Sequence, residues 1–538
     1  MGGDGRGVSG QPCVVTLAGT DLVTISEEPL SLEELLEVVA GARIELAPAA
    51  LDRIRASQAV VDAAVDGPDL VYGLNTGLGH MRNERMSREA LAGYQDGIVA
   101  SHAGGMGAPL PSRIVRAAMA ARLSGLARGG SGASVGAAQI LVALLNARIH
   151  PIVPEIGSVG AADLMHMAAI AQVALGRGRA EVDGRVLDGA EALRQAAIAP
   201  LTLGPKDGLA LVSANGVAIG HGALVVARAA DLASLADVAL ALSLEAIGGN
   251  HSIVDPAVAA AKGIAGQAAA ADHIRALLAG GPPEDSSPSS PVDGPTPPRG
   301  TPSVQDPLSF RVAPQVHGAF RTFLDVAWEA VETELNASDD NPLVSIADGR
   351  LISNGNFQPV VLALAFDAIR PAVAHVGQLS ERRMNHLWST VFAQPLVLEA
   401  ASGAWATGLQ SGLLLRYAAA TRYAALRGMA QPATLDIGTL DLAVEDHATN
   451  APETVRRTDE ALDALEDILA VELLMARGIL QAPGSHGGLG RGGRLVLAEL
   501  NEVIAKLPNA AASSDLHEAI VVAMRDRLLP ALASEGFA

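Results

Sequence analysis

The sequence has few aromatic residues, few charged residues and a single cysteine. Aromatic side chains account for 3% of its 538 residues and charged side chains for 18%. With so few large rings, the core must consist mainly of small aliphatic side chains, which favours close-packed helices. The single cysteine, Cys13, excludes an intramolecular disulfide framework and a cysteine-based zinc site, and it fits a reducing compartment.

Positive charge is also scarce. Lys and Arg number 38 against 58 Asp and Glu, so the formal net charge is −20, which argues against nucleic acid and membranes as partners. No apolar run reaches membrane-spanning length without charges, and Met1 to Gly10 lack the apolar core of a signal peptide. No metal-ligand spacing of the His-Glu-x-x-His type and no phosphate loop are present, so we expect no metal. These absences predict a cytoplasmic protein.

The helical patterns suggest three regions. We expect a flexible N-terminus over 1–25, an N-terminal helical and active-site loop region over 26–215, and a long central bundle with C-terminal helices over 216–538. Apolar residues recur at helical spacing from Ser31 to Leu46 and from Ala49 to Val65. Residues 280–303 are rich in Pro and Ser and predict a surface loop, either a lid or a tolerated insertion. A chain of this length can form either one domain or two.

One stretch organises the chain, and it runs from Pro154 to Leu164. Gly157 and Gly160 allow a tight backbone passage, and Asp163 is a carboxylate in the first turn of a helix. The apolar run that follows ends at Gly176. The stretch therefore predicts a loop that leads into a helix buried inside a large bundle.

The motifs Gly-Ser-Val-Gly-Ala and Asp-Leu in this stretch resemble motifs of the histidine, phenylalanine and tyrosine ammonia-lyases and the related aminomutases. In that family an Ala-Ser-Gly tripeptide lies between them and becomes methylidene-imidazolone, an electrophile. Here Ala161 and Ala162 precede Asp163, one residue fewer. The reaction needs a glycine amide to cyclise and a serine hydroxyl to lose, and neither is present. We therefore expect a degenerate prosthetic-group site and no cofactor. An Ala-Ser-Gly does occur at 401–403, but the Gly-Ser-Val-Gly motif does not precede it, so we do not expect it to form the prosthetic group.

The residues from Tyr72 to Gly79 resemble the family's Tyr-Gly-Ile-Asn-Thr-Gly-Phe-Gly, which implies that Tyr72 is the catalytic base. A phenol near helix N-termini or a basic group can have its pKa lowered enough to remove a proton. The alternative is a tyrosine packed in a turn. Further along, the family's asparagine that bonds the prosthetic group falls on Ser213 if no gap is allowed, and Asn215 lies two positions later.

Three residues match the family's substrate contacts. His102 follows the Ser-His pattern of the histidine-specific branch, and Glu445 follows its Glu-Asp-His pattern, so the resemblance implies a polar substrate side chain. Arg311 falls on the arginine that pairs with the substrate carboxylate, a role that suits a bidentate guanidinium. A structural histidine, a solvated carboxylate and a structural salt bridge are the respective alternatives.

Two loop residues are candidates for the pocket wall. Asn341 lies in a turn that ends in Asp-Asn-Pro, and Gln358 is the last residue of a segment that resembles the family's Gly-Gly-Asn-Phe-His. Both loops join helices, and their amides can reach a pocket or serve the turn itself.

The resemblance runs from about residue 72 to about residue 479. It implies an all-α fold, an elongated helical bundle that forms a homotetramer whose pockets are built from three subunits, and a small-molecule carboxylate substrate. Our first hypothesis is a lyase-like enzyme without the prosthetic group, which performs an elimination, addition or isomerisation on a substrate activated by its own structure. The second is a catalytically silent homologue that binds a ligand or a partner. The third is an ordinary histidine ammonia-lyase.

Overall fold

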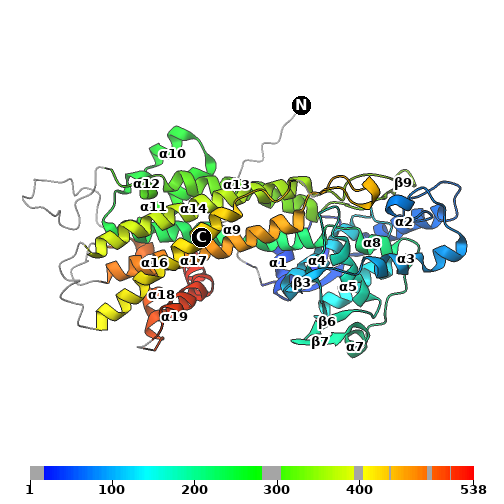
Figure 1. Ribbon diagram of the computed structural model, residues 1–538, viewed down its shortest axis with the longest axis horizontal. Helices are drawn as coiled ribbons and strands as arrows, with labels where there is room; N and C mark the ends of the chain where they lie inside the picture. The colour runs from blue at the N-terminus through cyan, green and yellow to red at the C-terminus, as the bar shows by residue number, and fades with distance from the viewer. Residues whose placement is uncertain are drawn as a thin grey trace, which may run out of the picture.

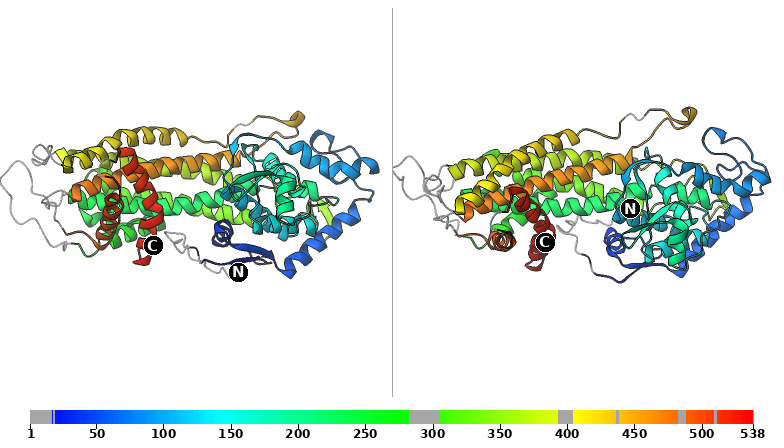
Figure 2. Two further views of the ribbon diagram at one scale, coloured as in Figure 1. Left: turned by 90° about the horizontal axis from the view of Figure 1, so that it is seen from below. Right: turned by 60° about the horizontal axis from the view of Figure 1, so that its bottom comes forward.

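The computed structural model describes residue 17 and residues 19–281, 305–392, 404–435, 438–481, 488–508 and 511–537. The molecule is elongated, with long helices side by side along its long axis and the short N-terminal elements gathered at one end (Figure 1). The two other views show the same division (Figure 2). The structure confirms the predicted all-α class, with small sheets of two or three short strands added.

Short helices and strands make up the N-terminal end. The helices are α1 (Leu32–Ala40), α2 (Pro48–Ala64), α3 (Arg88–His102), α4 (Ser112–Ala127), α5 (Val135–Asn146), α6 (Leu164–Ala174), α7 (Gly189–Gln195) and α8 (Asp207–Val212). The strands are β1 (Leu22–Ile25), β2 (Arg43–Leu46), β3 (Met106–Pro109), β4 (His150–Pro151), β5 (Pro154–Ile156), β6 (Arg179–Val182) and β7 (Arg185–Asp188). A 3₁₀ turn, η1 (Gly79–Met81), lies between α2 and α3.

Long helices form the rest of the molecule. They are α9 (Gly216–Ile247), α13 (Ala313–Leu335), α14 (Val360–Phe392), α16 (Ala404–Met429) and α17 (Ala451–Leu480). The shorter elements around them are η2 (His251–Val254), α10 (Pro256–Lys262), α11 (Ala265–Leu278), α12 (Leu308–Arg311), β8 (Leu343–Ser345), β9 (Arg350–Ile352), η4 (Asp441–Ala443), α18 (Arg491–Ala505), α19 (Ser513–Ala523), the π-helical turn η5 (Met524–Leu528) and α20 (Leu529–Ser534).

The first helix is shorter than its sequence pattern predicts. Ser31 and Glu34 form a reciprocal capping box at its start, and Gly41 ends it with a φ of +120°. The predicted helix over 31–46 is therefore wrong beyond residue 40, because the chain continues as β2, which pairs in parallel with β1. The flexible N-terminus predicted over 1–25 is likewise wrong at β1, whose Val23 and Ile25 are buried.

One large hydrophobic core links the two ends of the molecule. It includes Val115 of α4, Val225 of α9 and Leu465 of α17. The regional boundary expected at 215–216 coincides with the start of α9, but α9 packs on α4 as well as on α17. The Pro- and Ser-rich segment lies outside the described residues apart from Gly280 and Gly281.

Two helical stretches, Asp207–Ile247 and Val360–Thr390, have the length and apolar composition of a membrane span. Their most apolar windows are 94% and 61% buried within the protein itself. Helices at the core of a bundle share this composition. The composition is therefore weak support for a membrane span.

A buried ion pair holds α12 against the bundle. Arg383 of α14 donates to both carboxylate oxygens of Glu472 on α17, over 2.6 and 2.9 Å, and both side chains are fully buried. The same guanidinium donates to the backbone oxygen of Ser309 over 3.2 Å. Ser309 lies two residues before Arg311, so the pair fixes the helix that carries this arginine.

Replacing Arg383 by Met leaves the Glu472 carboxylate buried and unpaired. We expect the free energy of unfolding to fall by about 3–5 kcal/mol, and the Arg383→Met/Glu472→Met double variant to recover a large part of that loss. Denaturant unfolding followed by circular dichroism measures both. Arg382→Met is the matched control, since its side chain is 61% exposed and its ion pair contributes about 0–1 kcal/mol. Equal losses in the Arg382 and Arg383 variants would contradict this account.

Candidate functional site

The turn from Gly157 to Asp163 is fastened on both sides. The Ala162 N–H donates to the backbone oxygen of Phe357 over 3.1 Å, and the Asp163 N–H donates to that of Ala214 over 2.8 Å. The Asp163 carboxylate accepts from the Ala218 N–H on α9 and from the Ser158 hydroxyl, over 2.8 and 3.1 Å. Burial raises the pKa of Asp163 to about 6. The turn is therefore tied to the start of α9, as the organising role of this stretch predicts.

The segment before α17 crosses the same turn. The Asn450 N–H donates to the Val159 oxygen, and the Thr449 hydroxyl donates to the Gly160 oxygen, both over 2.7 Å. Gly160 has a φ of +76°, and a Cβ there would lie 2.5 Å from the Ala451 nitrogen. The absence of a side chain at Gly160 therefore allows the crossing that brings the segment with Glu445 to this end of the molecule.

Tyr72 lies in the loop between α2 and α3. Its phenolic oxygen accepts a hydrogen bond from the Gly79 N–H over 3.1 Å. Burial raises the pKa of Tyr72 most; Glu445 and Asp441 raise it further, while the Gly79 N–H and Arg82 lower it. The expected lowering of this pKa is therefore not found within one chain.

Glu445 is close enough to Tyr72 to act on its pKa, and His102 is close enough to Glu445 to act on the pKa of that carboxyl. His102 ends α3, and its Nδ1 lies 2.8 Å from the Ile98 oxygen. Burial raises the pKa of Glu445 most, Asp441 raises it further, and His102 lowers it. The three predicted residues are thus linked in series by electrostatic influence, Tyr72 through Glu445 to His102, and we call them the tyrosine cluster (Tyr72, His102 and Glu445).

The two loop residues predicted to line the pocket differ in their contacts: Gln358 contacts the segment that carries Glu445, whereas Asn341 contacts its own turn. The Gln358 side chain donates to the His447 oxygen over 3.0 Å, while its buried Oε1 has no partner among the described residues. The Asn341 side chain accepts from the Asn354 N–H over 3.1 Å. That bond is ordinary turn chemistry next to the β8–β9 hairpin.

Arg311 lies apart from the tyrosine cluster. It ends α12, which packs on α13 and α14 at the opposite end of the bundle from α2 and α3 (Figure 1). The half-buried guanidinium makes no hydrogen bond and no ion pair within the described part of the chain. One subunit therefore does not bring the predicted base and the predicted carboxylate clamp together.

Four residues near the site were missed or set aside by the sequence reasoning. Tyr94 lies beside Tyr72; burial raises its pKa to about 12, and its buried hydroxyl has no partner among the described residues. Asp441 and His80 contact each other across the Tyr72 loop. Asn215 lies at the start of α9. Only Asn215 carried a signal, the Asn-Gly pair of the family.

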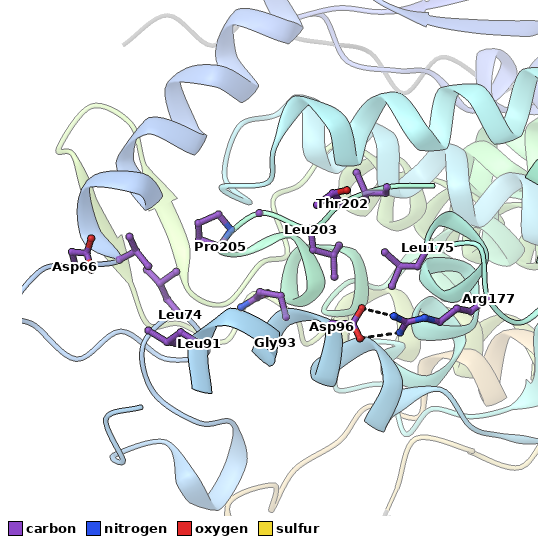
Figure 3. Close-up of a pocket in the computed structure, with 14 residues that line it drawn as sticks. Asp66, Leu74, Leu91, Gly93, Asp96, Leu175, Arg177, Thr202, Leu203 and Pro205 are labelled. Carbon is purple, nitrogen blue, oxygen red and sulfur yellow. Dashed lines mark hydrogen bonds and ion pairs between the residues drawn. The ribbon is translucent and has the colours of Figure 1, made fainter. Parts of the chain in front are cut away.

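A pocket of about 850 Å³ lies on the other side of the Tyr72 loop (Figure 3). Leu74 and Gln95 line it, and the Gln95 amide donates to the Gly73 oxygen over 3.1 Å. Asp96 and Arg177 lie side by side in the lining of the pocket and form two hydrogen bonds of 2.8 and 2.9 Å. Because these two charges satisfy each other, the pair leaves no uncompensated charge for a ligand. The tyrosine cluster does not line this pocket.

Within the described ranges, no group of three or more His, Cys, Asp or Glu side chains is arranged to hold a metal ion.

Comparison with known proteins identifies the family. The family model described as aromatic amino acid lyase matches residues 30–502. The chain belongs to the aromatic amino acid lyase family. It is 35% identical to the histidine ammonia-lyase of Gloeobacter violaceus over 512 residues, which cover 94% of this chain and 96% of the relative.

Solved structures of the superfamily share the fold. The histidine ammonia-lyase of Trypanosoma cruzi is 28% identical, with a TM-score of 0.82 over 95% of each chain. The ergothioneine-degrading enzyme ergothionase of Treponema denticola, in complex with desmethyl-ergothioneine sulfonic acid, is 26% identical. Its TM-score is 0.84, over 95% of this chain and 100% of that one.

The residues of this chain do not fit the prosthetic group that the family resemblance implies. Ala161 and Ala162 are buried and carry only methyl groups where a serine hydroxyl and a glycine are needed. Asn215 is fully buried beside the turn, and neither atom of its amide has a partner among the described residues. Asn215 immediately precedes α9, and the neighbouring Ala214 oxygen accepts from the Asp163 N–H. The ungapped placement of the family's asparagine on Ser213 stays a prediction.

A methyl group at Gly160 should disrupt the crossing between the turn and α17. We expect Gly160→Ala to lower the free energy of unfolding by about 1–3 kcal/mol more than Gly184→Ala does. The two glycines have nearly the same φ, +76° and +75°, but a Cβ at Gly184 meets nothing within 4 Å. Thermal or denaturant unfolding measures the difference. If both variants lose the same stability, the conformation alone matters and the crossing is not tightly packed.

Proposed function

We propose that this protein is an ammonia-lyase-like enzyme that works without the methylidene-imidazolone group. It eliminates an amine from a histidine-derived betaine, a substrate whose nitrogen is already quaternary. Tyr72 is the base. The observation that carries the proposal is the combination of a retained tyrosine cluster with alanines at the prosthetic-group turn.

An ordinary amino acid is a poor substrate for such a site. The pKa of a primary ammonium lies near that of a phenol, about 10 for the latter. A phenolate basic enough to remove a β-proton would take the ammonium proton first, which leaves a neutral amine, a poor leaving group. A quaternary ammonium has no N–H to lose. It keeps its charge beside the base and departs as a neutral tertiary amine without an electrophile.

The structural likeness to ergothionase names a substrate with this property. Ergothioneine is the trimethylammonium betaine of a histidine that carries sulfur on its ring. The likeness covers 95% of this chain at 26% identity. It supports a betaine substrate for this protein and accounts for the alanines at the turn, since this leaving group needs no activation.

The reaction balances with the residues at hand. The Tyr72 phenolate takes a proton from Cβ, the C–H electron pair becomes the Cα–Cβ double bond, and the Cα–N pair leaves with trimethylamine. The other product is an acrylate that bears the imidazole ring. The phenol then returns its proton to solvent. In this scheme Glu445 accepts a hydrogen bond from the ring N–H, and His102 lies beside it.

The carboxylate clamp comes from another subunit in this proposal. Arg311 has no partner within the described part of its own chain and lies at the far end of the bundle from Tyr72. A homotetramer with shared pockets, as the family resemblance implies, places an Arg311 of one subunit near the Tyr72 of another. Its guanidinium then binds the substrate carboxylate through two parallel hydrogen bonds. A cytoplasmic location, for which the single cysteine is an argument, stays a prediction.

Histidine ammonia-lyase is the second candidate, because relatives of that name share 34 to 38% of their residues with this chain. That activity needs an electrophile, and this turn lacks the serine and glycine that build it. An intact mass that matches the translated sequence, without loss of water, contradicts the second candidate. A mass lowered by lost water contradicts the proposal.

Tyr72→Phe decides whether this site is catalytic. We expect wild-type protein to release trimethylamine from the trimethylammonium betaines of histidine, with and without ring sulfur, and to release no ammonia from histidine. In Tyr72→Phe the turnover number should fall by at least 10³-fold, since no base remains. Mass spectrometry of the products measures both. Binding without turnover in wild type and variant alike would instead support a silent, ligand-binding homologue.

The pH dependence should reveal the charge of the substrate. Tyr72 must be deprotonated to act, so the rate rises with pH through its pKa, which is raised in the free protein. A bound cation lowers that pKa. We therefore expect the rising limb of kcat, which reports the complex, to lie at lower pH than the limb of kcat/KM, which reports the free enzyme. Coincident limbs would mean that no cation sits beside the phenol.

A further inference from the structure

The loop that carries Tyr72 is closed at its base and tied down at its tip. Thr76 pairs with Arg85, whose guanidinium donates to the backbone oxygens of Pro68 and Asp69 over 2.5 and 3.1 Å. The tip, residues 78–83, is exposed for most of its length. Within the described part of the chain, the hydrogen bonds from the tip to another segment all go to Asp441.

Asp441 uses both oxygens of its carboxylate on one residue of the tip. Oδ1 lies 2.8 Å from the Nδ1 of His80, and Oδ2 accepts from the His80 N–H over 3.0 Å. The same carboxylate fills the space beside Gly79, where any Cβ would overlap Oδ2. Gly79 has a φ of +55°, and its N–H is the donor to the Tyr72 oxygen. The contact therefore lies one residue from the group that holds the base.

The other side of this contact is a constrained turn. Asp441, Leu442 and Ala443 have φ values of +44°, +53° and +66°, a conformation that side chains other than glycine rarely adopt. Leu440 and Glu445 close the turn with hydrogen bonds of 2.8 and 3.3 Å. Strained backbone persists where surrounding contacts hold it, and such residues gather at functional sites. Here the turn aims Asp441 at the loop and places Glu445 four residues later.

We propose that Asp441 is a positioning residue that fastens the tip of the Tyr72 loop to the Glu445 turn. One carboxylate thereby sets the spacing between the proposed base and the residue that receives the substrate ring. The proposal rests on the function proposed above for Tyr72. The negative charges of Asp441 and Glu445 raise the pKa of Tyr72, whereas Arg82 and the Gly79 N–H lower it. Tyr94 is a further titratable neighbour of the phenol.

Two substitutions separate the position from the charge. Asp441→Ala removes both contacts to His80, so we expect kcat to fall about 10- to 100-fold with KM changed less than about threefold, as for a misplaced catalytic group. Asp441→Asn can keep both contacts through its amide and lose only the charge. We expect it to retain kcat within about threefold and to shift the rising limb of kcat/KM to lower pH, because one negative charge that raises the pKa of Tyr72 is gone.

Amide hydrogen exchange tests the tip without reference to activity. In the full-length protein, Asp441→Ala should speed exchange at residues 77–83 at least tenfold and leave α9 unchanged, whereas Asp441→Asn should not. Glu84→Ala is the matched control, since this exposed carboxylate lies on the same loop and makes no side-chain hydrogen bond within the described residues. Gly79→Ala, which displaces Asp441, should resemble Asp441→Ala.

The outcomes distinguish this proposal from the function on which it rests. Unchanged kcat and unchanged exchange at the tip in Asp441→Ala overturn the positioning role. Faster exchange throughout the protein also overturns it, because the residue would then be merely structural. If wild-type protein turns over no betaine while the tip exchanges faster in Asp441→Ala alone, the fastening stands and the proposed reaction fails.

Discussion

The site depends on one buried carboxylate at the point where three segments meet. Asp163 receives hydrogen bonds from the N-terminus of α9 and from Ser158, and its own N–H donates to Ala214. The positive end of a 32-residue helix favours an acceptor there. These bonds tie the turn to the start of α9. The crossing at Gly160 then adds the segment that carries Glu445.

The charges near Tyr72 are the physical basis on which a cationic substrate is proposed. Glu445 and Asp441 both act against the phenolate, and Arg82 and the Gly79 N–H only partly oppose them. In the function proposed above, a quaternary ammonium would compensate the two carboxylates and favour the phenolate in the same step, so that recognition of the substrate and activation of the base would be one electrostatic event. The buried cations of the bundle, such as Arg383, are paired and do not contribute.

Local rules predicted the long elements better than the short ones. Apolar spacing located α2, which buries one face, and the apolar run after Asp163 located α6, which is buried over most of its length. Apolar spacing failed after α1, where four residues form β2. A strand that short shows the same apolar spacing as a helical turn, and only its pairing with β1 decides between them.

The sequence by itself determined the fold class, the family and the replacement of the serine and glycine at the prosthetic-group turn, because these follow from residue identity in order along the chain. It also placed Tyr72, His102 and Glu445 in one candidate site through the family's motifs. Only the tertiary structure decided which groups act on one another. Asp441 and His80 lie 361 residues apart and share no motif, yet they meet at 2.8 Å. Arg311 belongs to the same set of motifs and lies elsewhere, because the distance between side chains is set by how the helices pack.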